Sequence, residues 1–258
     1  MKQKNILLSA TVMIAGTLLF NSCSKTPSDV GQKIAPQEFI SSTELIVTPG
    51  HATGTGINTV FTADGAPQSY YVNGTGQYFA INNGDTVKAE TPTLTFKSNL
   101  QYRFQIVFHG ENGEVSNDEY TDEGSPEDGA NIHQFFFVPV ATGTVKPVDQ
   151  QNDDGETING YVNLSGLSDH GGLDYNYADI SADGKKNLMI GLNGYFKVVS
   201  PGQTFDLVVD LRHGIQDKFS KNYPWYDDAF SKASNDVNAP FGATDFATLF
   251  HMHVQTVN

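Results

Sequence analysis

The stretch QYRFQIVFHG at residues 101–110 decides the fold class of this chain. Its apolar residues Phe104, Ile106 and Phe108 occupy every second position. Successive side chains of a strand point to opposite faces of the sheet, so this period of two predicts a strand with one apolar face. The Asn-Gly pair that follows at 112–113 is typical of a hairpin turn, because it readily takes positive φ.

Similar strand signals recur along most of the chain. Short runs of β-branched and aromatic residues alternate with Gly, Asn, Asp and Pro, and the chain holds 17 Phe, 11 Tyr and 25 Gly without a long helical run. This composition predicts an all-β protein. Strands are expected within residues 44–50, 58–65, 69–87, 93–115, 133–140, 158–166, 173–181, 187–202, 204–214 and 245–254.

A faint internal repeat suggests how these strands are grouped. Residues 96–110 and 196–214 each begin with Phe-Lys, pass through a turn into an alternating strand, and end on His-Gly. The repeat favours two related Ig-like β-sandwich halves, at residues 44–141 and 158–258, joined by a linker at 142–157. A single large β-barrel of about ten strands is the alternative.

The first residues have the pattern of an export signal. An uncharged, mainly apolar run at residues 6–20 precedes Cys23, the only cysteine. The run is too short for a membrane span of about 20 residues. It resembles a bacterial lipoprotein signal, which implies a signal peptide at 1–22, lipidation of Cys23, a tether at 23–43, and an outer-membrane location on the cell surface or the periplasmic face. An ordinary cleaved signal is the alternative.

The charge balance excludes one class of partner. The chain has 15 Lys and Arg against 29 Asp and Glu, so its formal net charge is −14 at pH 7. Nucleic-acid binding requires Lys and Arg to neutralise phosphates, and no basic stripe is present in the sequence. We therefore expect no nucleic-acid partner, and we expect the membrane to be reached through the lipid anchor.

Three short motifs stand out, and their residues are His133, Gln134, Phe135, Phe136 and Phe137, then Leu211, Arg212 and His213, then Thr244 and Asp245. Together they resemble a family of Bacteroidota outer-membrane lipoproteins of uncharacterised function, often encoded near TonB-dependent receptors. The resemblance implies a cell-envelope location, nutrient uptake and a TonB-dependent receptor as partner, and it brings no catalytic residue. This chain departs from the family at Ile132, where an acidic residue is expected, and at His251 and His253, where no histidine is expected.

A histidine pair near the C-terminus suggests a metal site. His251 and His253 stand two residues apart, so in a strand both side chains share one face. With His213 as a third ligand they would suit zinc or copper, and His133 and His109 are further candidate ligands. The alternative is a set of separate strand-end histidines, and His133 in particular is expected to bond a neighbouring backbone carbonyl.

Other chemistries have weaker signals. The acidic loops 117–131 and 151–157 are rich in oxygen ligands, but they do not fit an EF-hand, which makes calcium the less favoured ion. Ser168, Asp169 and His170 are contiguous, whereas catalytic triads are assembled from distant positions. We predict that the protein is not an enzyme.

An aromatic segment at residues 221–242 interrupts the strand pattern. It contains Trp225, the only tryptophan, with Tyr223 and Tyr226 beside it. Such aromatics stack on sugars or anchor in protein partners, and the alternative is a flap that covers an open sheet edge.

Taken together, these features predict a cell-envelope binding protein. It would hold a nutrient ion, with zinc or copper favoured, or a small ligand, for a membrane transporter. The alternative function is a structural or adhesive surface protein that binds glycan or protein through the segment around Trp225.

Overall fold

The computed structural model describes residues 41–54, 56–74, 76–110, 112–123, 129–145, 147–151, 157–161, 165–226 and 243–258. These belong to one compact unit, which spans Gln32–Asn258. The predicted signal peptide, Cys23 and the tether up to residue 40 lie outside the described residues. Within the described ranges, no helix has the length and apolar character needed to cross a membrane.

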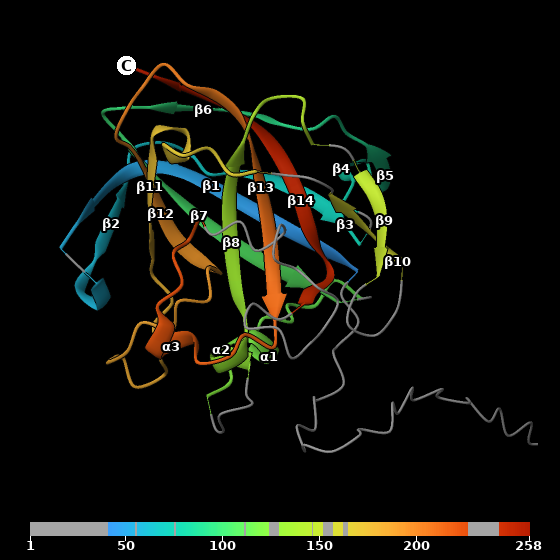
Figure 1. Ribbon diagram of the computed structural model, residues 1–258. Coiled ribbons are helices and arrows are strands. Elements are labelled where there is room, and N and C mark those ends of the chain that lie inside the picture. Colours follow the sequence, from blue (N-terminus) through green and yellow to red (C-terminus); the bar gives the residue numbers. More distant parts are fainter. Residues whose placement is uncertain are drawn as a thin grey trace, which may run out of the picture. The chain divides into compact units, whose positions relative to one another are not determined.

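The larger sheet, sheet A, contains eight of the described strands (Figure 1). Their order is β11-β12-β7-β1-β3-β4-β5, with β2 paired to β1, and every pairing is antiparallel. The strands are β1 (Ser42–Thr53), β2 (Val60–Ala63), β3 (Gln68–Asn73), β4 (Tyr78–Asn82), β5 (Asp85–Lys88), β7 (Gln101–His109), β11 (Leu173–Tyr177) and β12 (Asn193–Val198).

The second sheet, sheet B, has the order β6-β14-β13-β8, and its only parallel pair among the described strands is β6 with β14. It contains β6 (Thr93–Lys97), β8 (Gln134–Val140), β13 (Thr204–His213) and β14 (Ala243–Val257). A separate hairpin pairs β9 (Pro147–Gln151) with β10 (Thr157–Tyr161). The short helices are α1 (Asp118–Thr121), α2 (Gly129–Ile132), α3 (Lys218–Lys221), η1 (Gly56–Asn58) and η2 (His170–Gly172).

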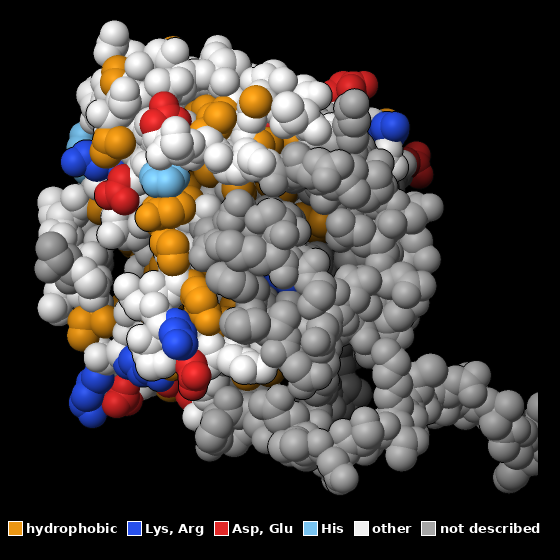
Figure 2. Space-filling view, in the orientation of Figure 1, with side chains coloured by type: hydrophobic (Ala, Val, Ile, Leu, Met, Phe, Trp, Pro, Cys, Tyr) orange, Lys and Arg blue, Asp and Glu red, His pale blue; other side chains and the backbone are white. Residues whose placement is uncertain are grey.

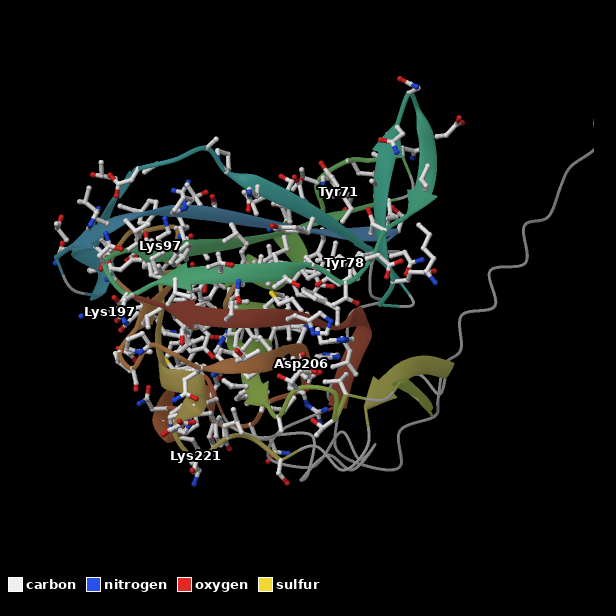
Figure 3. All side chains as sticks on the ribbon, turned by 90° about the horizontal axis from the view of Figure 1, so that it is seen from above. Tyr71, Tyr78, Lys97, Lys197, Asp206 and Lys221 are labelled. Atoms are coloured by element: carbon white, nitrogen blue, oxygen red, sulfur yellow. The ribbon has the colours of Figure 1, made fainter. Side chains whose placement is uncertain are left out.

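Strand β7 has the alternation that its sequence predicts. Phe104, Ile106 and Phe108 are fully or almost fully buried, and the residues between them are half-buried. Figure 3 shows the two sheets as stacked layers, with Tyr71 on one and Asp206 on the other. Rings from both layers meet between them: Phe104 of β7 contacts Phe137 of β8 edge to face, with 6.3 Å between ring centroids. The predicted all-β, sandwich-like fold is confirmed.

The strands are distributed differently from the expected two halves. β7 and β12, one from each predicted half, pair with each other in sheet A, and β8 and β13 do the same in sheet B. The two repeat strands, β7 and β13, each lie in the interior of a different sheet. β9 lies inside the stretch expected as a linker. Long-range pairing between the halves therefore produces one sandwich, in which each sheet ends in two edge strands.

Strand β13 is buried on both faces, which adds a second apolar layer outside sheet B. Its odd-numbered residues face the core between the sheets, whereas Val208 belongs to a smaller cluster on the opposite face. Residues two apart share a face, so Asp206, Asp210 and Arg212 lie on the side of Val208. All three are at most 1% exposed. The remaining members of this outer cluster are Phe136, Val138, Val140, Ile215 and Leu249.

Candidate functional site

His251 and His253 lie side by side on one face of β14, as expected. Their ring centroids are 5.8 Å apart, and the rings are nearly perpendicular. The register of β14 on β13 places Asp206 opposite His253, and Nδ1 of His253 lies 2.5 Å from Oδ1 of Asp206. The other carboxylate oxygen of Asp206 accepts a hydrogen bond from the backbone N–H of Gly143 at 2.9 Å. Desolvation lowers the pKa of His251, and the nearby His253 lowers it further, while Asp206 acts in the opposite direction.

The structure does not bring the other predicted ligands to this pair. His213 is seven residues beyond Asp206 on β13, so at about 3.3 Å per residue it lies about 23 Å along the strand from the residue opposite His253. His109 ends β7 in sheet A, where its Nε2 lies 3.2 Å from Oε2 of Glu44. Among the described residues, no three or more His, Cys, Asp or Glu side chains are grouped to hold a metal ion.

His133 and His213 instead form a buried stack at one end of the sandwich. Their ring centroids are 4.7 Å apart with an interplanar angle of 15°. His133 Nδ1 lies 3.0 Å from the carbonyl oxygen of Gly129, as expected for a structural histidine. Nζ of Lys218 donates to the carbonyl oxygens of His133, at 2.5 Å, and of Ala130, at 2.9 Å. These bonds connect α3 to α2 and to the start of β8.

Two buried charged groups near this end have shifted pKa values. Burial lowers the pKa of Lys218 to about 7, although the negative charge of Asp179 opposes the shift. Burial raises the pKa of Asp179 to about 6, against the hydrogen bonds that it accepts from the backbone N–H groups of Gly191 and Asn193. Both shifts follow from the cost of holding a charge away from water.

The pKa of Lys218 predicts how stability depends on pH. Between about pH 7 and pH 10.5 the unfolded chain holds a proton on this amine that the folded chain does not, so the free energy of unfolding rises with pH. Lys218→Met should remove a slope on the order of 1 kcal/mol per pH unit, measured by urea unfolding between pH 7 and pH 9. Lys221→Met, an exposed residue of the same helix, should keep the slope. Equal slopes in the two variants would contradict the assignment.

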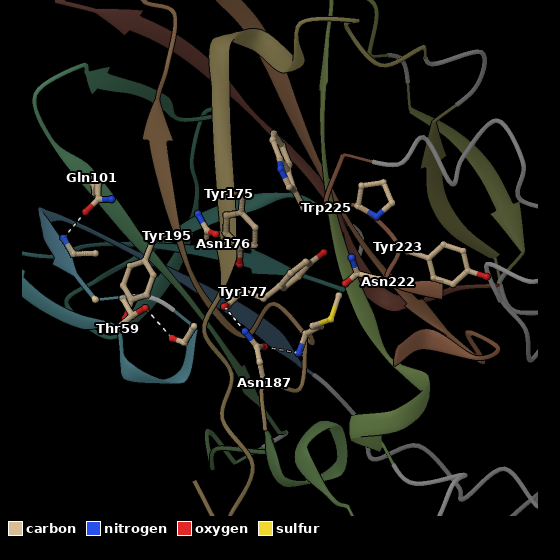
Figure 4. Close-up of a pocket in the computed structure, with 15 residues that line it drawn as sticks. Thr59, Gln101, Tyr175, Asn176, Tyr177, Asn187, Tyr195, Asn222, Tyr223 and Trp225 are labelled. Atoms are coloured by element: carbon tan, nitrogen blue, oxygen red, sulfur yellow. Dashed lines mark hydrogen bonds between the residues drawn. The ribbon is translucent and has the colours of Figure 1, made fainter. Parts of the chain in front are cut away.

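A pocket of about 480 Å³ lies beside the edge strand β11 (Figure 4). It extends from the loop after β1, across β11 and β12, to the segment that contains Trp225. Its walls are aromatic rings, amides and backbone, and none of the described residues that line it is charged. The lining residues are Ala52, Gly54, Gly56, Thr59, Gln101, Tyr175, Asn176, Tyr177, Asn187, Met189, Tyr195, Asn222, Tyr223, Pro224 and Trp225.

Tyr175 lines this pocket, and its hydroxyl is buried behind the pocket wall. Its side chain is 4% exposed, and its hydroxyl has no hydrogen-bond partner within the described part of the chain. Burial raises the pKa of this hydroxyl well above its usual value, so it stays protonated. The hydroxyl lies against Gly194 of β12, where an added Cβ would come within 2.0 Å of it. Because a buried, unpaired hydroxyl is costly, it would gain from a hydrogen bond to a ligand group, which reaches it only if the side chains around it move.

The floor of the pocket is held by local hydrogen bonds. Asn187 donates through Nδ2 to the carbonyl oxygen of Tyr177 at 2.7 Å, and its Oδ1 accepts from the backbone N–H of Met189 at 2.9 Å. Met189 has φ +52°, a left-handed conformation that is uncommon for a residue other than glycine. The Tyr177 hydroxyl donates to the carbonyl oxygen of Phe135 at 2.6 Å. These bonds hold the segment between β11 and β12 in place at the pocket.

The aromatic segment contributes two of its three predicted residues to the pocket. Trp225 and Tyr223 line it, whereas Tyr226 stacks on His170 with ring centroids 3.6 Å apart. The Trp225 ring is 7% exposed and packs on Tyr175, and its carbonyl oxygen accepts from Phe137 N–H at 2.8 Å. Trp225 therefore bonds to the edge strand β8, packs against Tyr175 of β11 and forms a pocket wall.

Several pocket residues were not singled out in the sequence. Tyr175 and Tyr177 flank Asn176 in a segment that the sequence analysis treats only as a strand. The alternation of Tyr with Asn was a signal, because amphipathic rings and amides suit a half-exposed site. Gln101 and Tyr195 carry no such signal, since only the pairing of β7 with β12 brings them near each other.

Some predicted features fall outside the described part of the chain. These are Cys23, the rest of the aromatic segment at 227–242, and the side chains of Thr244 and Asp245. On the face drawn in Figure 2, basic and acidic side chains lie close together, and the coloured side chains form no continuous basic area. Comparison with protein-family models, curated proteins and solved structures found no match.

Proposed function

We propose that this protein binds a neutral, hydroxyl-rich ligand of the carbohydrate class in the pocket beside β11. The observation that carries this proposal is the buried, unpaired hydroxyl of Tyr175 in a pocket with no charged lining residue among those described. A sugar would offer hydroxyl groups to this donor and to the amides of Asn176 and Asn222. Its apolar C–H faces would pack on the rings of Tyr223 and Trp225.

The absence of charge in the described lining favours a neutral ligand over an ionic one. A bound carboxylate or phosphate needs a paired cation when it leaves water, because an unpaired buried charge is costly. Polar ligands without charge need only hydrogen bonds, which the hydroxyls and amides of the lining supply. This proposal corresponds to the second of the functions predicted from the sequence, the binding of glycan near Trp225.

Tyr175→Phe tests the proposal. In the purified full chain, screened against neutral oligosaccharides and then measured by calorimetry, the variant should bind about five- to thirtyfold more weakly, since a hydrogen bond to the ligand contributes about 1–2 kcal/mol. Without ligand its free energy of unfolding should be unchanged or higher, because the hydroxyl that is removed has no described partner. Tyr70→Phe, on β3 and outside the pocket, is the matched control and should bind as the wild type does.

Two results would contradict the proposal. One is the absence of binding to any neutral oligosaccharide at millimolar concentration. The other is a Tyr175→Phe affinity equal to that of the wild type for a glycan that does bind. A preference for sulfated or uronic-acid glycans would point to an ionic ligand instead.

The location and partner remain proposals that rest on the sequence. A lipid anchor at Cys23 would hold the pocket at the outer membrane, and a TonB-dependent receptor would take up the bound ligand. The support for both is the resemblance of residues 1–23 and of the three motifs.

A further inference from the structure

We propose that His251 and His253 form an exchangeable site for a divalent transition metal, zinc or copper, with Asp206 as the residue that positions His253. This site uses none of the residues of the carbohydrate pocket, so the two proposals stand or fall separately. It retains the histidine pair predicted from the sequence and replaces the third ligand, His213, with open coordination positions.

The spacing of the two rings suits one shared ion. Two imidazoles bound to a tetrahedral ion at nitrogen–metal distances of about 2.0–2.1 Å hold their ring centroids about 5 Å apart. The observed separation of 5.8 Å is close to this value, so small side-chain rotations would complete the geometry. The strand backbone fixes both side chains on one face, because β14 pairs with β13 and with β6 on either side.

The contact with Asp206 prepares His253 to bind a metal. The Asp206 side chain is 1% exposed, and its carboxylate faces Nδ1 of His253. A carboxylate accepts a proton donor at this distance, so Nδ1 carries the proton and the lone pair of the neutral ring lies on Nε2. Metal-bound histidines commonly donate their second ring nitrogen to a carboxylate in this way. The His253 side chain is 41% exposed, which gives an ion access from solvent.

The remaining coordination positions would be filled by exchangeable ligands. The described residues offer no third His, Cys, Asp or Glu ligand, so water or an external ligand would complete the coordination. Such an open site binds more weakly than a closed structural site and releases its ion more readily. Two imidazole ligands favour copper and zinc over calcium or magnesium, which prefer oxygen.

The test measures binding of Cu²⁺ and Zn²⁺ to the untagged full chain carrying Cys23→Ser, which removes the only thiol. Calorimetry should show one site per chain, and the electron paramagnetic resonance spectrum of bound Cu²⁺ should show coupling to two imidazole nitrogens. His251→Ala and His253→Ala should each lower the affinity at least tenfold and leave coupling to one nitrogen. Asp206→Asn should keep both nitrogens and weaken binding about 10- to 100-fold, as expected for a residue that orients a ligand.

His109→Ala is the matched control. His109 also contacts a carboxylate, that of Glu44, but it lies in sheet A away from the pair. Its variant should bind both ions as the parent chain does. The proposal is overturned if neither ion binds at millimolar concentration, if the double variant His251→Ala/His253→Ala keeps the affinity of the parent, or if the copper spectrum contains no pair of nitrogens.

Discussion

Replacing Arg212 with Met should lower the free energy of unfolding by about 3–5 kcal/mol at neutral pH. Arg212 and Asp210 lie two apart on the outer face of β13, with side chains at most 1% exposed. Nη1 of Arg212 is 3.6 Å from Oδ2 of Asp210. Without the guanidinium, the carboxylate loses this cation in an apolar layer where Phe136 and Leu249 are its cross-strand neighbours. Urea unfolding of the full chain measures the loss.

The double variant Asp210→Leu/Arg212→Met separates the charge effect from the loss of packing. Replacing both partners with apolar side chains leaves neither charge behind, so most of the lost stability should return. If the double variant is as unstable as Arg212→Met, packing of the Arg212 stem, not the loss of the ion pair with Asp210, accounts for the loss.

Replacing Phe196 with Ala should also lower the free energy of unfolding by about 3–5 kcal/mol. This fully buried ring lies in β12, and its centroid is 4.7 Å from that of Phe104 and 4.5 Å from that of Tyr175. It also contacts Trp225 edge to face, so it supports the wall of the pocket. The substitution leaves a cavity between the sheets that a β-sandwich with paired strands closes only in part.

A matched control lies three residues further along the chain. Val199 is 59% exposed, and Val199→Ala should change stability by less than about 0.5 kcal/mol. The chemical denaturation midpoints of the two variants can be compared directly. A loss below about 1 kcal/mol in Phe196→Ala would mean that the aromatic layer collapses around the gap, contrary to the packing seen between the sheets.

The candidate sites could be predicted from the sequence only where local spacing sets the geometry. His251 and His253 share a face because a strand alternates with a period of two, and this holds in any sheet that contains it. The sequence also predicted His213 as a third ligand, but the structure does not place it beside His251 and His253, for a different reason. Whether it lies near His253 depends on the register between β13 and β14, and the antiparallel register places Asp206 there instead.

The sequence by itself determined the all-β class, the strand at 101–110 with its buried face, and the histidine pair at 251 and 253. These follow from side-chain alternation and turn chemistry, which are local. Only the tertiary structure decided that the two repeats share one sandwich, that Tyr175 and Trp225 line one pocket, and that Asp206 supports His253. Such features depend on which strands pair and in what register, and those choices are fixed by burial of apolar faces between residues far apart in the chain.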